Sequence, residues 1–247
     1  IMKLNCDLGE SFGAWVMGQD AEVMPHIDMA NVACGFHAGD ADVMYQTLAL
    51  AKENGVVVGA HPGYQDIPGF GRRSLKLDQQ QLINAIVYQV GALTAMAKMH
   101  GLDVEYVKPH GAMYNDMMAN AVMLEQVMTA IALLNKQRKT PLKLMLLATA
   151  AHQQHLEMSA NLGVELLFEA FADRRYTDDG YLVPRNRQSA VLSESEMLGQ
   201  VERLAKSSEV VTESGKVLKL RADTLCVHGD NAEGVAQIVQ IKTLLAQ

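Results

Sequence analysis

The chain has 247 residues, 49% of them hydrophobic, which suits one α/β barrel of about 250 residues with a large core better than two domains. Three cysteines without a CxxC pair argue against a disulfide framework. The N-terminus lacks a signal core, and the longest apolar stretch (142–151) is shorter than a membrane span of ~20 residues. We therefore expect a cytoplasmic protein that binds no membrane. The net charge of -7, with scattered Lys and Arg, disfavours nucleic acid as a partner.

Strand-like and helix-like segments alternate along the chain. Short β-branched runs bounded by turn residues predict seven strands, at 2–6, 29–34, 56–60, 105–109, 143–148, 164–170 and 224–228. The intervening segments predict helices over 40–53, 78–99, 115–135, a helix ending near 161, one over 193–206, and one from about 231 onward. Asp40 is a candidate N-cap and Gly55 a candidate stop for the first of these helices.

Two further segments interrupt this alternation. The polar, arginine-rich stretch 173–189 is long for a passive connection and is typical of a lid or binding loop. The stretch 210–218 predicts a small hairpin with a turn at Ser214 and Gly215. No linker divides the chain, so we expect a single domain over 1–247 with a parallel sheet, either closed into a barrel or open and doubly wound.

Four histidines occur in one local setting. His37, His61, His110 and His228 each follow an apolar run and are followed within two residues by glycine. Active sites of α/β sheets lie beyond the carboxyl ends of the strands, where these side chains are expected to meet. A single such histidine could simply bond a loop carbonyl. Four together predict a functional site.

Carboxylates accompany these histidines. The first predicted strand ends in DLGE, which brings Asp7 and Glu10 to the same face, and Asp7 could act as a general base, bind a metal, or form an Asx turn. One aspartate and two histidines from neighbouring strand ends, Asp7, His37 and His61, resemble a hydrolytic metal site. Their spacing differs from that of a helical metal-binding motif, so the metal remains one alternative.

The fourth predicted strand supplies VKPHG. Because side chains alternate along a strand, Lys108 and His110 are expected on one face, where they could stabilise an oxyanion. The sixth strand ends in Glu169 and is followed by Asp173 and Arg174, and arginine suits a carboxylate or phosphate.

The seventh strand supplies His228 and Asp230, and the aspartate could orient the imidazole. Familiar nucleotide and nucleophile motifs are missing. ESGKVL lacks the first glycine and the Ser or Thr of a P-loop, and no G-x-S-x-G elbow occurs. The sequence therefore contains no recognisable ATP site and no serine nucleophile.

Seven segments carry a family resemblance: LNCDLGESFG, NVACGFHAGD, GAHPGYQD, GFGRRS, VKPHGAMYN, EAFADRRY and VHGD. In this order they resemble the LamB/YcsF family nearly from end to end. The resemblance implies a seven-stranded β/α barrel similar to the glycoside hydrolase/deacetylase group. It also implies the ATP-dependent 5-oxoprolinase reaction, in which 5-oxo-L-proline, ATP and water give L-glutamate, ADP and phosphate. The resemblance further implies that this activity belongs to a complex with B and C subunits.

The residue pattern at the strand ends and the family resemblance together predict a site that binds a lactam. The expected catalytic residues are Asp7, His61, Lys108, His110 and Glu169. The expected substrate-binding residues are His37, Asp40, Asp173, Arg174, His228 and Asp230.

In this hypothesis Asp7 or Glu169 activates water, Lys108 and His110 stabilise the oxyanion, and Arg174 holds the substrate carboxylate. ATP is the co-substrate, used with the partner subunits or at an unrecognised site in this chain. Two alternatives remain: a stand-alone metal-dependent amide hydrolase of the deacetylase type, and a non-catalytic substrate-binding subunit.

Overall fold

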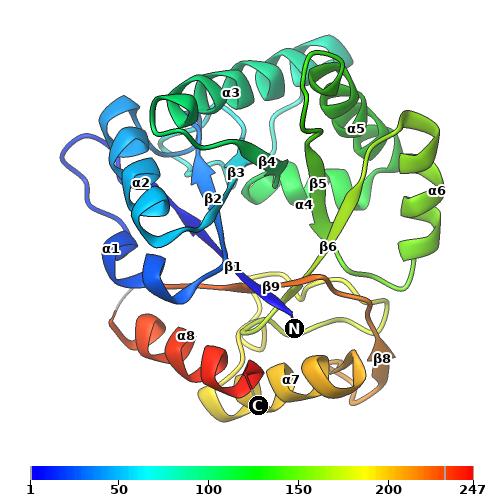
Figure 1. Ribbon diagram of the computed structural model, residues 1–247. Coiled ribbons are helices and arrows are strands. Elements are labelled where there is room, and N and C mark those ends of the chain that lie inside the picture. The colour runs from blue at the N-terminus through cyan, green and yellow to red at the C-terminus, as the bar shows by residue number, and fades with distance from the viewer. Residues whose placement is uncertain (1, 231, 247) are drawn as a thin grey trace.

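Seven parallel strands close into a barrel surrounded by helices in the computed structural model, which describes residues 2–230 and 232–246 (Figure 1). The strands are β1 (Lys3–Leu8), β2 (Met29–Ala33), β3 (Val57–His61), β4 (Val104–Val107), β5 (Lys143–Leu147), β6 (Leu166–Phe171) and β9 (Thr224–Val227). The barrel closes because β9 pairs in parallel with both β6 and β1. The seven-stranded barrel is thus confirmed, and the open sheet is not observed.

Helices form the outer layer of the barrel. They are α1 (Asp20–Val23), α2 (Ala41–Asn54), α3 (Gln79–Met99), α4 (Gly111–Ala119), α5 (Ala121–Asn135), α6 (His152–Leu162), α7 (Glu194–Ser207) and α8 (Ala232–Leu245), with a 3-10 turn at Met24–His26. The predicted hairpin is present as β7 (Glu209–Val211) and β8 (Val217–Lys219). The predicted start of the last helix at Asn231 lies outside the described residues.

The ends of α2 follow the sequence signals. The Asp40 side chain accepts a hydrogen bond from the backbone N–H of Val43 at 2.9 Å, and Gly55 adopts a left-handed conformation with φ 66°. Helix α3 begins with a capping box between Asp78 and Gln81. Capping therefore fixes where these helices begin and end.

The prediction of one helix over 115–135 is wrong. Two helices, α4 and α5, occupy this region and meet at a bend of 119°. Asn120 has extended backbone angles, and its side chain accepts from the N–H groups of Val122 and Met123. Asn120 is thus the N-cap of α5, hidden in the sequence because apolar residues continue on both sides of it. The loop predicted after the first strand also contains α1 and the 3-10 turn.

Helix α3 has the length and apolar composition of a membrane span. Helices α4 and α5 reach that length and apolar composition only when they are taken together as a bent pair. In the barrel, the apolar stripe of α3, including Leu82, Ile86, Val90 and Leu93, is buried. The helix packs against α2, α5, β3 and β4. It is therefore a helix of the outer layer of the barrel.

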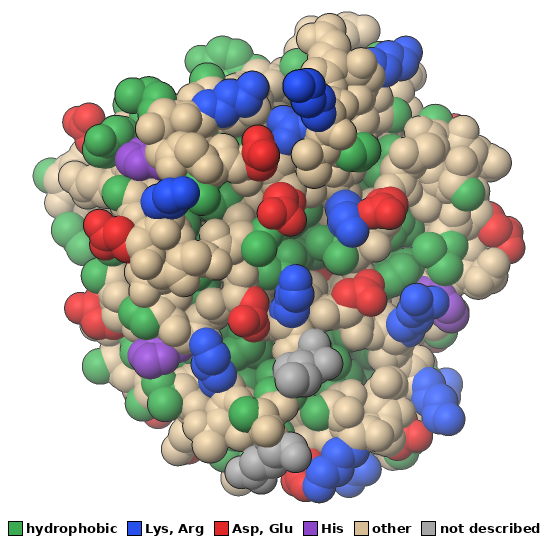
Figure 2. All heavy atoms as spheres, viewed as in Figure 1, with side chains coloured by type: hydrophobic (Ala, Val, Ile, Leu, Met, Phe, Trp, Pro, Cys, Tyr) green, Lys and Arg blue, Asp and Glu red, His purple; other side chains and the backbone are tan. Residues whose placement is uncertain are grey.

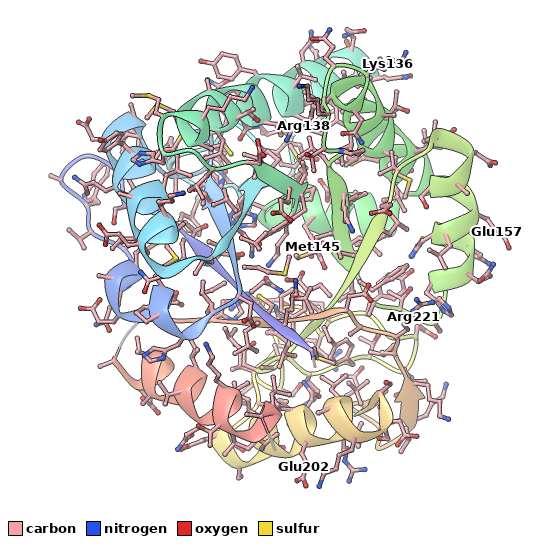
Figure 3. The ribbon with its side chains drawn as sticks, in the orientation of Figure 1. Lys136, Arg138, Met145, Glu157, Glu202 and Arg221 are labelled. Atoms are coloured by element: carbon pink, nitrogen blue, oxygen red, sulfur yellow. The ribbon has the colours of Figure 1, made fainter. Side chains whose placement is uncertain are left out.

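The barrel interior is filled by side chains. Met29, Tyr106 and Met145 form a small apolar cluster inside the ring of strands, where Figure 3 labels Met145. A Cβ on Gly59 would overlap the ring of Tyr106, so this glycine makes room for the tyrosine. On the face shown in Figure 2, acidic and basic side chains are interspersed. The three cysteines are buried and free.

Candidate active site at the carboxyl end of the barrel

A cavity of about 450 Å³ lies at the carboxyl ends of the strands. Most of the predicted site residues line it: Asp7, His61, Lys108, His110, Arg174, His228 and Asp230. A hollow of about 750 Å³ lies at the opposite end of the barrel, where the strands begin, and none of the predicted catalytic residues lines it. The chemistry-bearing side chains therefore gather at the end where α/β barrels carry their active sites.

Lys108, which follows β4, forms the floor of the cavity. Its Nζ lies 3.0 Å from Oδ1 of Asp7 and 2.7 Å from Oε1 of Glu169, and the residue is only 3% exposed. Burial opposes the charge on Lys108, but the carboxylates of Asp7 and Glu169, with the Cys226 thiol, raise the pKa of Lys108 well above its ordinary value. The cavity floor thus carries a fixed positive charge.

Tyr114 on α4 completes the surroundings of Glu169. Its hydroxyl donates to Oε2 of Glu169 at 3.0 Å. Tyr114 lines the cavity, whereas Glu169 is fully buried and does not line it. Burial and the adjacent carboxylate of Glu169 raise the pKa of Tyr114 well above its ordinary value, so the phenol remains a donor. Tyr114 is not predicted as a site residue, and its one signal in the sequence is its place four residues after His110 at the start of a helix.

Asp7, unlike Glu169, lines the cavity. The Asn31 amide donates to its Oδ1 at 2.8 Å, and its Oδ2 lies 3.3 Å from Nε2 of His61. Burial favours the neutral acid, but the positive charges of His61 and Lys108 outweigh it and lower the pKa of Asp7 well below its ordinary value. Asp7 is therefore an ionised, oriented carboxylate at neutral pH.

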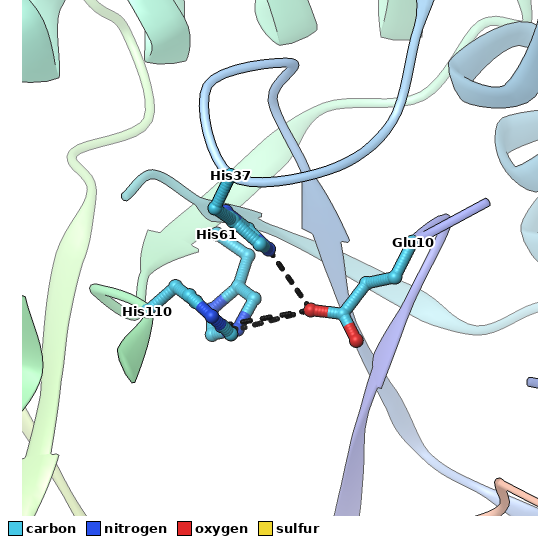
Figure 4. A group of neighbouring side chains, drawn as sticks. All are labelled: Glu10, His37, His61 and His110. Carbon is cyan, nitrogen blue, oxygen red and sulfur yellow. Dashed lines mark hydrogen bonds and ion pairs between the residues drawn. The ribbon is translucent and has the colours of Figure 1, made fainter. Parts of the chain in front are cut away.

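Three histidines surround the carboxylate of Glu10 (Figure 4). Oε1 of Glu10 lies 2.9 Å from Nε2 of His37, 3.5 Å from Nδ1 of His110 and 4.0 Å from Nε2 of His61. Burial, with the imidazoles of His37 and His61, lowers the pKa of His110 to about 2, so His110 is neutral. The candidate metal set of Asp7, His37 and His61 omits Glu10 and His110, which the structure brings to the same point.

His228 lies on the other side of the cavity. Its Nδ1 is 3.0 Å from Oδ2 of Asp173, which stands behind it and does not line the cavity, and Asp230 lines the wall nearby. Arg185, in the polar loop after β6, also lines the wall, with Nη2 3.5 Å from Nε2 of His228. No pattern in the arginine-rich loop distinguishes Arg185 from its neighbours, so sequence analysis missed it as well.

Arg174 and Asp40 have structural partners. Arg174 lines the cavity, and its guanidinium donates to the carbonyls of Val183 at 2.7 Å and Ala190 at 3.3 Å, which fastens the loop after β6. Asp40 caps α2, accepts a hydrogen bond from the N–H of Gly13 at 2.8 Å, and does not line the cavity. The geometry thus places Arg174 at the site and Asp40 at the start of α2, outside the cavity lining.

A closed parallel barrel with lysine, carboxylates and imidazoles at the carboxyl end defines an α/β-barrel protein with a cavity lined by ionisable side chains. The LamB/YcsF family profile matches residues 2–247, and the chain belongs to the LamB/YcsF family.

Relatives and a solved structure carry related names. The chain is 52% identical to a Vibrio campbellii protein named as the A subunit of 5-oxoprolinase, over 99% of this chain and 95% of that protein. It is 49% identical to the protein of the same name from Pseudomonas fluorescens, over 99% of this chain and 96% of that protein. The crystal structure of a lactam utilization protein from Thermus thermophilus has a TM-score of 0.86 and 37% identity, with 100% of this chain and 96% of that one covered.

Proposed function

We propose that this chain is the lactam-opening subunit of an ATP-dependent 5-oxoprolinase. The observation that carries the proposal is Lys108, held between the carboxylates of Asp7 and Glu169 at the floor of the cavity. A volume of about 450 Å³ suits a small molecule such as a five-membered lactam. The names of the relatives supply the substrate class.

Ring opening requires water to add to the lactam carbonyl carbon and the bond from that carbon to the ring nitrogen to break. Asp7 is the base in this scheme, because it is ionised and lines the cavity whereas Glu169 is fully buried. It accepts the proton of the attacking water and returns it to the departing nitrogen. Lys108 faces the carbonyl oxygen and stabilises its developing charge, whereas His110 is neutral and its one N–H, at Nε2, donates to the carbonyl oxygen of Phe70.

The substrate also carries a carboxylate. Arg174 and Arg185 are cations on the same side of the cavity, and Arg174 is partly committed to loop carbonyls. We assign the carboxylate to this pair, with Arg185 as the exposed partner, because guanidinium groups bind carboxylates through paired hydrogen bonds. His228 and Asp230 complete that wall.

The use of ATP is assigned to the other subunits of the complex. A five-membered lactam is a stable amide whose opening requires coupling, and the sequence of this chain contains no recognisable phosphate loop. We therefore assign activation by ATP to the B and C subunits, which act with this chain in the cytoplasm. The word "subunit" in the names of the relatives supports a multi-subunit enzyme.

Reconstitution tests this proposal. The purified chain is mixed with the B and C subunits, 5-oxo-L-proline and ATP, and glutamate and ADP are measured with each component omitted in turn. We expect glutamate only in the complete mixture. Glutamate from this chain alone without ATP would establish a stand-alone amide hydrolase instead, an alternative that the Glu10 and histidine cluster favours. Glutamate formed at full rate by B and C alone would show that lactam opening does not require this chain.

A further inference from the structure

Two histidines of the site are oriented by backbone carbonyls. Nδ1 of His61 lies 2.6 Å from the carbonyl oxygen of Lys108, and Nε2 of His110 lies 2.8 Å from the carbonyl oxygen of Phe70. A carbonyl oxygen only accepts hydrogen bonds, so both of these nitrogens carry hydrogen. The other nitrogen of each ring is then the one available to a ligand.

These two remaining nitrogens face each other. Nε2 of His61 and Nδ1 of His110 are 3.0 Å apart, inside a part of the barrel where both side chains are buried. If neither ring carried a positive charge, their lone pairs would meet at this distance. A positive centre, either a second proton on His61 or a metal ion, resolves the contact, and the carboxylate of Glu10 faces the same point.

We propose that Glu10, His37, His61 and His110 bind one divalent transition-metal ion of the zinc type. Ligand atoms 2.0–2.1 Å from a tetrahedral ion lie about 3.3 Å from one another. Four of the six separations among the ligand atoms, 2.9, 3.0, 3.5 and 4.0 Å, lie on both sides of this value. Three imidazoles and one carboxylate favour zinc and its neighbours over calcium or magnesium, which prefer oxygen ligands.

His37 is the ligand that must adjust. Its ring stacks on that of His110 with centroids 3.6 Å apart and planes within 4°, so one ion cannot lie in both ring planes. Carbonyls hold His61 and His110, whereas the buried Nδ1 of His37 has no hydrogen-bond partner among the described residues. Rotation of the His37 ring therefore brings its Nε2 onto an ion already bound by the other three.

Metal binding follows from this geometry alone, and its use in catalysis rests on the proposed function. Asp7 lies 3.3 Å from Nε2 of His61, beside the ligand set, so an ion that accepted a fifth ligand would hold a carbonyl oxygen next to the proposed base.

The test measures metal binding without substrate or partner subunits. The chain is stripped with a chelator, and Zn²⁺ is titrated by calorimetry while Co²⁺ is followed by its visible absorption. We expect one ion per chain, a Co²⁺ spectrum of a site with nitrogen ligands, and at least 100-fold weaker binding in Glu10→Gln and in His110→Ala. Glu10→Gln is nearly isosteric, and circular dichroism checks that it is folded.

The matched control is His152→Ala, which removes a histidine from the HQQH segment of α6, outside the proposed set. It should bind zinc as the unmodified chain does. No binding by the unmodified chain would overturn the inference, because a proton on His61 would then be the positive centre. Unchanged affinity in folded Glu10→Gln would overturn it as well. A chain that binds zinc but supports no glutamate formation would refute only the proposed function, and a fully active chain that binds no zinc would refute only the metal site.

Discussion

The ammonium of Lys108 lies 2.7 Å from Oε1 of Glu169, and the second carboxylate oxygen of Glu169 accepts from the hydroxyl of Tyr114. Neither charged side chain is more than 4% exposed. A buried ion pair adds little net stability, but removing one partner leaves the other charge without compensation. The pair therefore connects the floor of the cavity to the stability of the barrel.

Lys108→Met should destabilise the barrel strongly. The substitution leaves Asp7 and Glu169 without their shared cation, and breaking such a pair costs about 3–5 kcal/mol. Urea unfolding measures the change. The control is Lys143→Met, whose partner Glu165 is exposed and whose loss should cost at most about 1 kcal/mol.

The double variant Lys108→Met with Glu169→Gln should recover part of this loss. It removes one charge of each sign, so Asp7 and His61 remain as a balanced pair. Glutamate formation should stay absent, since the cation on the cavity floor is gone. A double variant no more stable than Lys108→Met would show that the two charges are not coupled.

Asp173→Asn should lower the pKa of His228. Burial opposes the charged imidazole, but the carboxylate of Asp173, 3.0 Å away, outweighs burial and raises the pKa of His228 above its ordinary value. A raised folded-state pKa contributes stability below the unfolded pKa of about 6.5, and this contribution is lost as pH rises through the folded value. NMR titration of the ring checks the pKa.

Thermal unfolding of the unmodified chain and of Asp173→Asn checks the sign of the pH dependence. The melting temperature of the unmodified chain should exceed that of Asp173→Asn most clearly near pH 6, and this difference in melting temperature should narrow toward pH 9. A difference that grows with pH would contradict the assignment of the charge to His228.

Two glycine substitutions should act in opposite directions. A methyl group on Gly59 would overlap the buried Tyr106 ring, and overpacking of this kind costs about 1–3 kcal/mol or more, so Gly59→Ala should lower the melting temperature. Gly91, inside α3, has open space around it, and Gly91→Ala should stabilise by up to about 1 kcal/mol. Equal melting temperatures for the two variants would contradict this packing of the barrel interior.

Local patterns in the sequence were sufficient to predict much of the barrel. The apolar runs mark each strand, and the residues that follow them, such as His61 and Lys108, meet at one end because all strands are parallel. Closure could not be derived from such patterns, because it depends on the pairing of β9 with β1, more than 200 residues apart. The family resemblance supplied that information.

The contacts that could not be predicted from the sequence depend on tertiary geometry. Glu10 is expected at the site face, but the path of its loop places its carboxylate beside three histidines, and no spacing rule gives that path. Tyr114 reaches Glu169 across 55 residues, from a helix whose end at Asn120 the apolar pattern conceals. Arg185 lies in a loop without periodicity. Each has the right chemistry in the sequence but no local signal of its position.

The activity of Asp7→Asn in the reconstituted complex is the most direct test of the central claim, that this cavity opens the lactam. The change keeps the size of the side chain and removes the charge that would accept the water proton, so glutamate formation should fall about 100- to 10,000-fold. Asp42→Asn, on the exposed first turn of α2, is the matched control and should keep full activity. A folded Asp7→Asn chain that forms glutamate at the rate of the unmodified chain would contradict the account.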